Sequence, residues 1–255
     1  MLLFIGYLHL LGYAPASITT YVCAIGYIHK LRSLPDPTSY YPVQRLLAAA
    51  TKTSTQQDTR LPITLPILRS MCLSFNHTGL TPYVCSLLRA MFTTAFFGLL
   101  RVGEMTSDSS NQVSLHLHQL SFHTHHAVLT IHKFKHNASN NPFHIVLKRQ
   151  NDLDLCPLQA LRLYIASRGS AKGPLFCFQN LHPVSRNFFI SKLNYILKLC
   201  GLSPLLYKSH SFRIGAASFY ASIGLSDEQI RLLGRWRSNA FRRYIRCQRI
   251  IHSLS

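Results

Sequence analysis

The segment from Tyr83 to Leu100, YVCSLLRAMFTTAFFGLL, places the strongest constraint on the fold. It is apolar on nearly every face of a helix, so it must be surrounded by protein on all sides. Thr81 is a suitable N-cap residue, and Pro82 suits the first helical position. We therefore predict a buried helix that begins at Pro82 and delivers Arg101 and Glu104 at its end.

Three short segments after this helix have the composition of strands. They are rich in Val, Leu, Ile and His and are separated by polar loops such as HNASNN, which favours a small antiparallel sheet. They cover residues 112–119, 127–133 and 142–148. Lys133 would lie at the end of the middle strand.

The chain after residue 156 carries start and stop signals for several helices. The expected helices open at Pro157, at Ser185 and at Ser209 or Ser211, and they end at Gly169, Gly201 and Gly224. Ser226 and Gln229 form a capping box for the next helix. A last helix is expected from about Ser238 to Ile251, and it carries Tyr244. The predicted fold class is mainly α with a small antiparallel β-sheet.

The first 50 residues indicate a separate helical unit. They contain LLFIGYLHLLGY, then SITTYVCAIGYIHKL with Ser17 as a candidate N-cap, then PVQRLLAAA opening at Pro42. Residues 51–66, TKTSTQQDTRLPITLP, are polar and then interrupted by prolines, which is typical of a linker. We place a domain boundary near residue 60, which gives domains 1–60 and 61–255.

The charge balance indicates a polyanionic partner. Lys and Arg number 27 against 8 Asp and Glu, for a formal net charge of +19. No acidic residue lies between Asp108 and Asp152. Seven arginines follow Glu228, namely Arg231, Arg235, Arg237, Arg242, Arg243, Arg246 and Arg249. A surface that faces nucleic acid is expected there, although a basic RNA-binding or ribosome-associated protein would satisfy the charge equally well.

Other features favour an intracellular protein. The seven cysteines include no C-x-x-C pair, so neither a disulfide framework nor a zinc ribbon is indicated. The apolar start MLLFIGYLHLLGY lacks the basic region of a signal peptide and is interpreted as a core helix. No stretch approaches 18 apolar residues, so no membrane partner is expected. The glycosylation sequons at Asn76 and Asn137 are short enough to arise by chance.

The segment HSFRIGAAS carries candidate phosphate-binding groups. His210 and Arg213 are three residues apart and share one face at a helix start, where free N–H groups also attract phosphate. Cleaving a phosphodiester without a metal requires cations, a nucleophile, a base and an acid. An H-x-x-R pair alone is a weak sign of this chemistry. It gains force because LLRVGEM, HSFRIGAAS and LGRWRSNAFRRYIR occur in that order, with helices between them.

These three motifs resemble those of the tyrosine recombinases, or integrases, especially those of eukaryotic Crypton- and DIRS-type mobile elements. The resemblance is clear over residues 80–250 and looser over residues 1–70, which look like the family's helical core-binding domain. It implies a catalytic domain of that fold, acting on double-stranded DNA as a homotetramer. No cofactor, metal or small-molecule substrate is implied. A nuclear location is implied if the source is eukaryotic.

The resemblance also assigns roles to individual residues. It places the nucleophile at Tyr244, which would form a 3′-phosphotyrosyl link and expel a 5′-hydroxyl. Arg101 and Arg213 would hold the phosphate oxygens, because a guanidinium binds them bidentately. His210 would accept the tyrosine proton, and Lys133 would protonate the leaving oxygen. We expect Glu104 to orient a catalytic side chain without touching DNA, and we expect DNA contacts from Arg235, Arg237, Arg242, Arg243 and Lys135.

Two positions depart from the family pattern. Many relatives have His or Trp nine residues before the tyrosine, but this chain has Arg235 there and Trp236 one residue later. Either residue could fill that place. The lysine segment HKFKHN is also irregular, so Lys135 competes with Lys133.

Two further alternatives stay open. The histidines of LHLHQLSFHTHH raise the hypothesis of a metal site, although histidines on a short strand more simply face solvent or phosphate. They are His116, His118, His123, His125 and His126. A domesticated protein of the same fold that binds DNA without recombining it is the second alternative.

Overall fold

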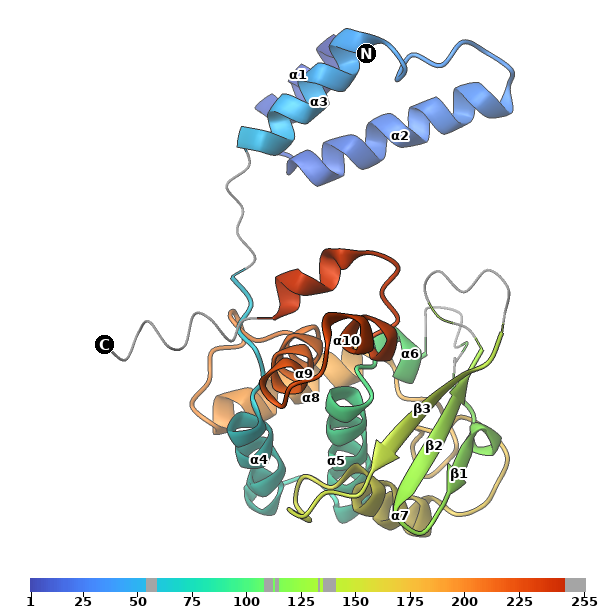
Figure 1. Ribbon diagram of the computed structural model, residues 1–255, viewed down its shortest axis with the longest axis vertical. Coiled ribbons are helices and arrows are strands. Elements are labelled where there is room, and N and C mark those ends of the chain that lie inside the picture. The colour runs from blue at the N-terminus through green and yellow to red at the C-terminus, as the bar shows by residue number, and fades with distance from the viewer. Residues whose placement is uncertain (54–58, 108–111, 113–114, 133, 135–140, 246–255) are drawn as a thin grey trace. The chain divides into compact units, whose positions relative to one another are not determined.

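The computed structural model describes residues 1–53, 59–107, 112, 115–132, 134 and 141–245 (Figure 1). The chain forms two compact units, Met1–Asp58 and Thr59–Ser255. The division falls beside residue 60, within the segment that has linker composition. Over the described residues, no helix has both the length and the apolar character needed to cross a membrane.

The first unit is a group of three helices, α1 (Leu2–Leu10), α2 (Pro15–Leu31) and α3 (Tyr41–Thr53). Their inner faces form a small apolar core of Ile5, Leu8, Ile18, Val22 and Val43. The prediction that Ser17 caps the second helix is wrong. This helix begins at Pro15 with Ala14 at the N-cap position, because the fixed φ of proline suits the first helical residue.

The second unit is mainly helical with one small sheet, as predicted. Its α-helices are α4 (Leu65–Ser74), α5 (Pro82–Phe97), α6 (Val102–Met105), α7 (Pro157–Arg168), α8 (Arg186–Leu199), α9 (Ser211–Ser222) and α10 (Asp227–Leu233). The described residues of this unit also form the 3-10 helices η1 (Phe75–His77), η2 (Leu117–Gln119) and η3 (Asn239–Tyr244). The strands β1 (Leu120–Phe122), β2 (His126–Ile131) and β3 (Phe143–Lys148) pair antiparallel in that order.

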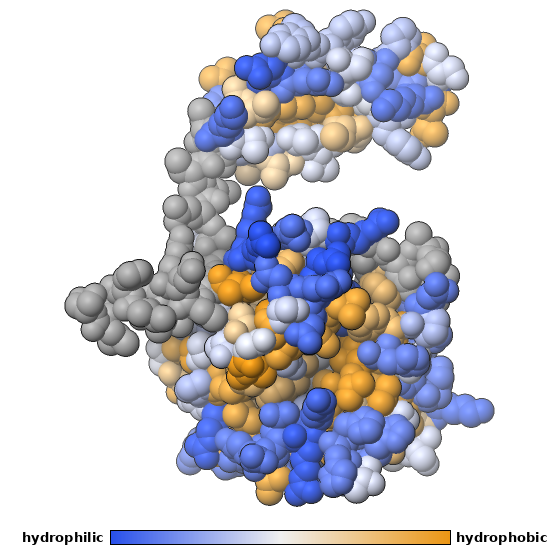
Figure 2. Space-filling model, in the orientation of Figure 1, coloured by the Kyte–Doolittle hydropathy of each residue, from blue (hydrophilic) through white to orange (hydrophobic). Residues whose placement is uncertain are grey.

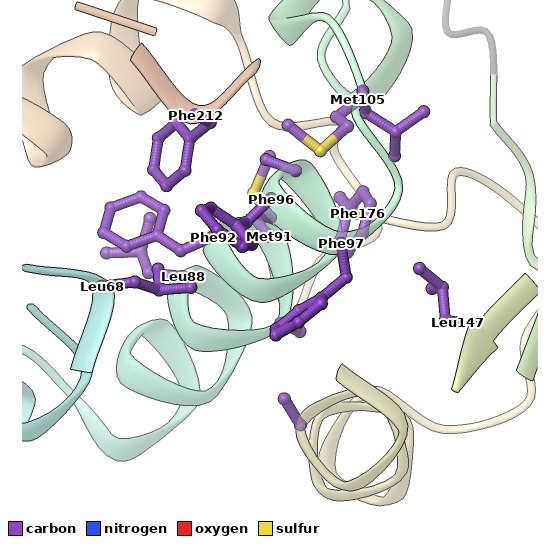
Figure 3. Packing of buried hydrophobic residues seen from close by; sticks show 14 of the residues in the cluster. Leu68, Leu88, Met91, Phe92, Phe96, Phe97, Met105, Leu147, Phe176 and Phe212 are labelled. Carbon is purple, nitrogen blue, oxygen red and sulfur yellow. The ribbon is translucent and has the colours of Figure 1, made fainter. Parts of the chain in front are cut away.

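The central helix α5 is buried, which confirms the prediction for this segment. The Thr81 hydroxyl accepts a hydrogen bond from the Val84 N–H at its start. Phe92 packs against aromatic rings from three other elements, Phe75, Phe189 and Phe212. Figure 3 shows Phe92 and Phe212 in this cluster of apolar side chains. The apolar side chains therefore meet protein on several sides, as a helix without a polar face requires.

The end of this helix differs from the prediction. The helix stops at Phe97, and Leu99 takes a left-handed conformation with φ +45°. The chain then turns and starts α6, in which Arg101 occupies the N-cap position. Arg101 and Glu104 therefore belong to a separate short helix, so a turn rather than a continuous helix sets their positions.

The sheet confirms two predicted strands and corrects the third. β2 alternates between buried and partly exposed residues, with Ala127, Leu129 and Ile131 buried against the core. The strand predicted over residues 112–119 is wrong: residues 117–119 form η2, and the strand follows at 120–122. The Leu115 carbonyl instead accepts a main-chain hydrogen bond from Leu175, so a contact with a distant segment, not local composition, decides its pairing.

The C-terminal helices mostly begin and end where their capping residues predict. α7 begins at Pro157, α8 is capped by Ser185, and Ser226 and Gln229 form the capping box of α10. The last helix is a correction, because the residues up to Tyr244 form the 3-10 helix η3. Its expected continuation to residue 251 lies outside the described residues. The helix α4 was not predicted, since its first two residues, Leu65 and Pro66, belong to the segment with linker composition.

Residues 61–63 are fixed to the helix α9 and to the segment that precedes it. The Leu61 N–H donates to the Leu206 carbonyl at 2.8 Å, and the Ile63 N–H donates to the Ser211 carbonyl at 3.0 Å. Gly215 allows this close approach, because a Cβ atom there would lie 1.7 Å from the Ile63 carbonyl oxygen. The first residues of the second unit thus hold the start of α9.

Candidate active site

The start of α9 presents two predicted catalytic residues. His210 lies at the N-cap position, and Arg213 follows in the first turn. The Arg213 side chain is only 1% exposed, and its Nη2 donates to the Gly234 carbonyl at 2.8 Å. Its Nη1 donates to the Leu99 carbonyl. Arg213 is therefore held by main-chain oxygens from the ends of two other helices.

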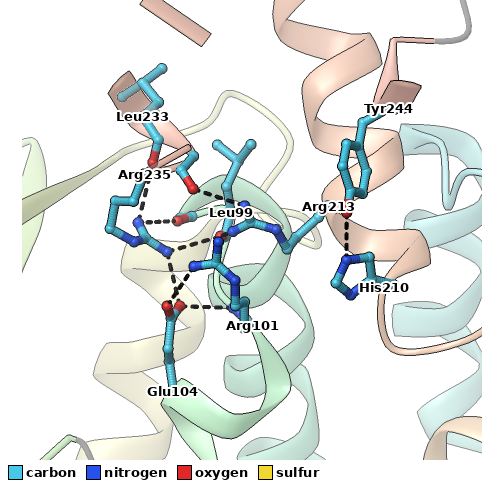
Figure 4. Close-up of polar contacts among 10 residues, drawn as sticks. Leu99, Arg101, Glu104, His210, Arg213, Leu233, Arg235 and Tyr244 are labelled. Carbon is cyan, nitrogen blue, oxygen red and sulfur yellow. Dashed lines mark hydrogen bonds and ion pairs between the residues drawn. The ribbon is translucent and has the colours of Figure 1, made fainter. Parts of the chain in front are cut away.

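Tyr244 lies beside this helix start (Figure 4). Its hydroxyl oxygen is 2.8 Å from His210 Nε2, a hydrogen-bonding distance. The Ser218 hydroxyl donates to the Tyr244 carbonyl at 3.0 Å, which fixes the backbone of η3 against α9. The predicted nucleophile and the predicted proton acceptor are thus in direct contact, although they are 34 positions apart in the chain.

Trp236 packs between the tyrosine and the arginine. Its ring centroid is 5.4 Å from that of Tyr244, and the Arg213 guanidinium carbon lies 4.3 Å from the centroid of the indole ring. The latter distance is a cation–π contact. Of the two residues that could fill the place of the family's His or Trp, Trp236 is the one that contacts Tyr244.

Glu104 joins Arg101 to the cluster. One carboxylate oxygen accepts the Arg101 N–H at 2.8 Å, and the other accepts from Arg101 Nη1 at 3.0 Å. The Glu104 side chain is 5% exposed, whereas that of Arg101 is 21% exposed. Arg101 therefore retains access to solvent, while Glu104 lies beneath it.

Arg235 lies inside the protein, where it does not offer the DNA contact expected from the sequence. Its side chain is 1% exposed and donates to Glu104 at 2.9 Å, to the Leu99 carbonyl at 3.0 Å and to two further carbonyls. Its main chain is in the left-handed region, with φ +54°. Sequence alone could not separate this arginine from its exposed neighbours.

The cluster carries an excess of positive charge. The guanidinium groups of Arg101 and Arg235 pair with the Glu104 carboxylate, whereas that of Arg213 is held by carbonyl oxygens, so the four groups carry a formal charge of +2. Burial, reinforced by the charges of Arg101 and Arg235, lowers the pKa of Arg213 to about 9. Burial also lowers the pKa of Arg235. An anion bound here would stabilise the charged forms, and a phosphodiester is such an anion.

The remaining predicted DNA-binding arginines lie on the surface near this site. Arg237, Arg242 and Arg243 are exposed, and Figure 2 shows a hydrophilic surface over α10 and η3. Arg242 is paired with Asp227 at 2.8 Å. Lys133 and Lys135 lie outside the described residues.

The histidine segment forms two stacked pairs of rings. The ring centroids of His116 and His118 are 5.7 Å apart, and those of His123 and His126 are 4.4 Å apart. Over the part of the chain that the structure describes, no three His, Cys, Asp or Glu side chains gather as a metal site would need.

Sequence reasoning missed the main-chain groups of the site. The carbonyl oxygens of Leu99 and Gly234 anchor the buried arginines, and Ser218 fixes the backbone at Tyr244. Carbonyl oxygens occur at every residue, so no sequence signal marks them.

No protein-family model and no curated protein matches this chain. The structure is similar to several solved DNA complexes. The Tn1549 transposon integrase (residues 82–397) in complex with circular intermediate DNA has a TM-score of 0.64 at 14% identity, covering 97% of this chain and 82% of that one. A lambda integrase dimer bound to a core site has a TM-score of 0.61 at 16% identity, covering 96% and 63%.

The XerH site-specific recombinase bound to its difH substrate has a TM-score of 0.58 at 14% identity. The similarity covers 80% of this chain, which spans 55% of the XerH chain. The neighbours support the general resemblance to recombinases, while the closer likeness to Crypton and DIRS elements stays a prediction. This chain has the fold of the tyrosine recombinases and integrases.

Proposed function

We propose that this chain is a site-specific recombinase that cuts and rejoins double-stranded DNA through Tyr244. The observation that carries the proposal is the 2.8 Å contact between the Tyr244 hydroxyl and His210 Nε2, next to a cluster of buried arginines. A tyrosine hydroxyl is mostly protonated at neutral pH, so it needs an acceptor for its proton as it attacks.

In the proposed reaction the Tyr244 oxygen attacks the scissile phosphorus while His210 takes the phenolic proton. The new bond is a 3′-phosphotyrosyl ester, and the bond to the 5′-oxygen breaks. That oxygen leaves as a 5′-hydroxyl after it receives a proton, the role predicted for Lys133. Attack by a 5′-hydroxyl on the phosphotyrosyl ester reverses these steps and rejoins a strand.

The arginines would stabilise the charge that develops on the phosphate. Arg101 is the guanidinium with the most exposed side chain of the three, so it offers the most direct contact. Arg213 has three of its five N–H donors not used by the two carbonyl contacts. Fixed donors that need no reorganisation are an effective way to stabilise a transition state.

The proposal extends to the rest of the chain. Met1–Asp58 would be a DNA-binding unit of the core-binding type, and four copies would assemble on two duplexes. The ordered motifs shared with Crypton- and DIRS-type proteins support an origin in a mobile element and a nuclear location. The similar structures are those of integrases and recombinases on DNA, which favours DNA over RNA as the partner.

The test is the formation of a covalent adduct with DNA. A duplex that binds the protein is first selected from a randomised pool and is then nicked, so that cleavage releases a short fragment and traps the enzyme. Wild type should give a DNA-linked band in a denaturing gel, and Tyr244→Phe should give none while binding the duplex normally. Tyr195→Phe, at an exposed tyrosine of α8, is the matched control and should form the adduct.

The outcomes separate the alternatives. No adduct at a duplex that wild type binds would refute the enzyme in favour of a protein that only binds DNA. An adduct that persists in Tyr244→Phe would show that another tyrosine is the nucleophile. Selection of RNA over duplex DNA would favour the RNA-binding alternative.

A further inference from the structure

Arg235 has an almost fully enclosed charged side chain near the candidate active site, with 1% of it exposed. Its guanidinium has four hydrogen-bond acceptors, the carbonyls of Gly98, Leu99 and Leu233 and the carboxylate of Glu104. The rings of Phe134 and Phe143 lie 6.0 and 5.5 Å from its central carbon. Hydrogen-bond acceptors and aromatic rings together therefore fix the position of the Arg235 guanidinium.

The acceptors of Arg235 also hold the two arginines that are predicted to bind phosphate. Glu104 accepts from Arg235 and from Arg101, through the main chain and the side chain of the latter. The Leu99 carbonyl accepts from Arg235 and from Arg213 (Figure 4). Arg235 thus shares one acceptor with each of them, the Glu104 carboxylate with Arg101 and the Leu99 carbonyl with Arg213.

We propose that Arg235 is a positioning residue that sets the locations of Arg101 and Arg213 through the Glu104 carboxylate and the Leu99 carbonyl. The inference rests on the proposed function. It differs from the role of a DNA contact, because each terminal nitrogen of Arg235 already donates to two protein acceptors, whereas each terminal nitrogen of Arg213 donates to one. It also leaves the family's His or Trp place to Trp236, which lies against Tyr244.

The backbone at Arg235 supports a dedicated role. A left-handed conformation is unfavourable for a residue with a long side chain, and it persists only where the surroundings enforce it. The bond from the Arg235 N–H to the Leu232 carbonyl and the side-chain bonds together provide that enforcement. This conformation turns the side chain inward, whereas Arg237 two residues later is exposed.

The test compares the rate of adduct formation with the affinity for DNA. The variants are Arg235→Gln, Arg235→Lys, Glu104→Gln and the double variant Arg235→Gln/Glu104→Gln. Arg69→Lys, at a half-exposed arginine of α4 that pairs with Asp152, is the matched control. Each protein is measured on the selected nicked duplex at saturating DNA, and its dissociation constant for the duplex is measured separately.

We expect Arg235→Gln to slow adduct formation by about 10- to 100-fold, as small misplacements of catalytic groups do. Its affinity for the duplex should change by less than about threefold, because no phosphate contact is removed. Arg235→Lys should recover part of the rate. The double variant should be no slower than the slower single variant, because both changes break the same connection. Should Arg235→Gln fail to fold, Arg235→Lys and Glu104→Gln carry the same comparison.

Three results would overturn the inference. These are wild-type rates in the Arg235 variants, affinity that falls in step with the rate, and single-variant losses that multiply in the double variant. If wild type forms no adduct, the proposed function fails and the emission of Trp236 still tests the positioning role. Arg213 lies 4.3 Å from this ring, so a displaced Arg213 should alter the emission of the folded, DNA-free protein. Unchanged emission in Arg235→Lys and Arg235→Gln would refute the inference.

Discussion

Replacing Gly215 with alanine should destabilise the second unit, although the same change usually stabilises a helix. Alanine is about 1 kcal/mol better than glycine in a helix interior. In α9, however, the new Cβ would lie 1.7 Å from the Ile63 carbonyl oxygen and 2.6 Å from its carbonyl carbon. These are main-chain atoms, so they cannot turn aside as a flexible side chain would.

The size of the effect follows from this geometry. An ordinary contact begins near 3.4 Å, so the two backbones must separate by roughly 1.7 Å. Overpacking of this kind costs about 1–3 kcal/mol. Losing the hydrogen bond from the Ile63 N–H to the Ser211 carbonyl adds about 1 kcal/mol. After the helix gain of about 1 kcal/mol is subtracted, the net loss of about 1–3 kcal/mol corresponds to a Tm lower by roughly 2–12 °C in a unit of this size.

Urea unfolding followed by Trp236 fluorescence measures this free energy, because the chain has one tryptophan and it packs in the second unit. Gly103→Ala is the matched control, since a Cβ at that position would meet open space within 4 Å. The variant Gly215→Ala should also slow adduct formation, because α9 carries His210 and Arg213. A Gly215→Ala protein as stable as Gly103→Ala would refute the packing of α9 on residues 61–63.

Three other predictions concern pH, salt and metal ions. Burial raises the pKa of Tyr220 to about 12, so its phenol contributes stability below pH 10 and loses that contribution as pH rises toward 12. The free energy of unfolding of wild type should therefore fall more steeply between pH 10 and 12 than that of Tyr220→Phe. Parallel curves for the two proteins in urea titrations would contradict this. The affinity for duplex DNA should fall steeply from low to physiological ionic strength, because 27 basic residues face only 8 acidic ones, and a flat salt titration in a fluorescence-anisotropy assay would exclude phosphate-dominated binding. EDTA should leave adduct formation intact, because arginines hold the phosphate in the proposed reaction; loss of the adduct that zinc or magnesium restores would revive a role for the histidine segment.

Local signals in the sequence predicted most helix starts. A capping residue bonds a free N–H group of its own first helical turn, and a proline there has no N–H group to satisfy, so neither effect depends on distant residues. The examples are Thr81 with Pro82, Ser185 alone, and Ser226 with Gln229. The buried character of α5 also followed from its composition alone.

Features that depend on distant contacts could not be predicted in this way. The turn at Leu99 splits Arg101 and Glu104 from the end of α5, and its carbonyl is held by arginines more than 100 residues away. The burial of Arg235 depends on Glu104, which is 131 residues away in sequence. In the sequence it resembles the exposed arginines around it, so only the tertiary structure separates its role from theirs.

The anchoring of the buried arginines by main-chain oxygens has a consequence for evolution. Every amino acid supplies a carbonyl group, so the residues at positions 99 and 233 can change identity without removing an anchor. Leu233 is 38% exposed, which leaves its side chain under weak packing constraint. Gly234 is the exception, because a Cβ there would lie 1.6 Å from the Trp236 ring. Substitutions at positions 99 and 233 can therefore accumulate while the guanidinium groups of this chain keep their carbonyl acceptors.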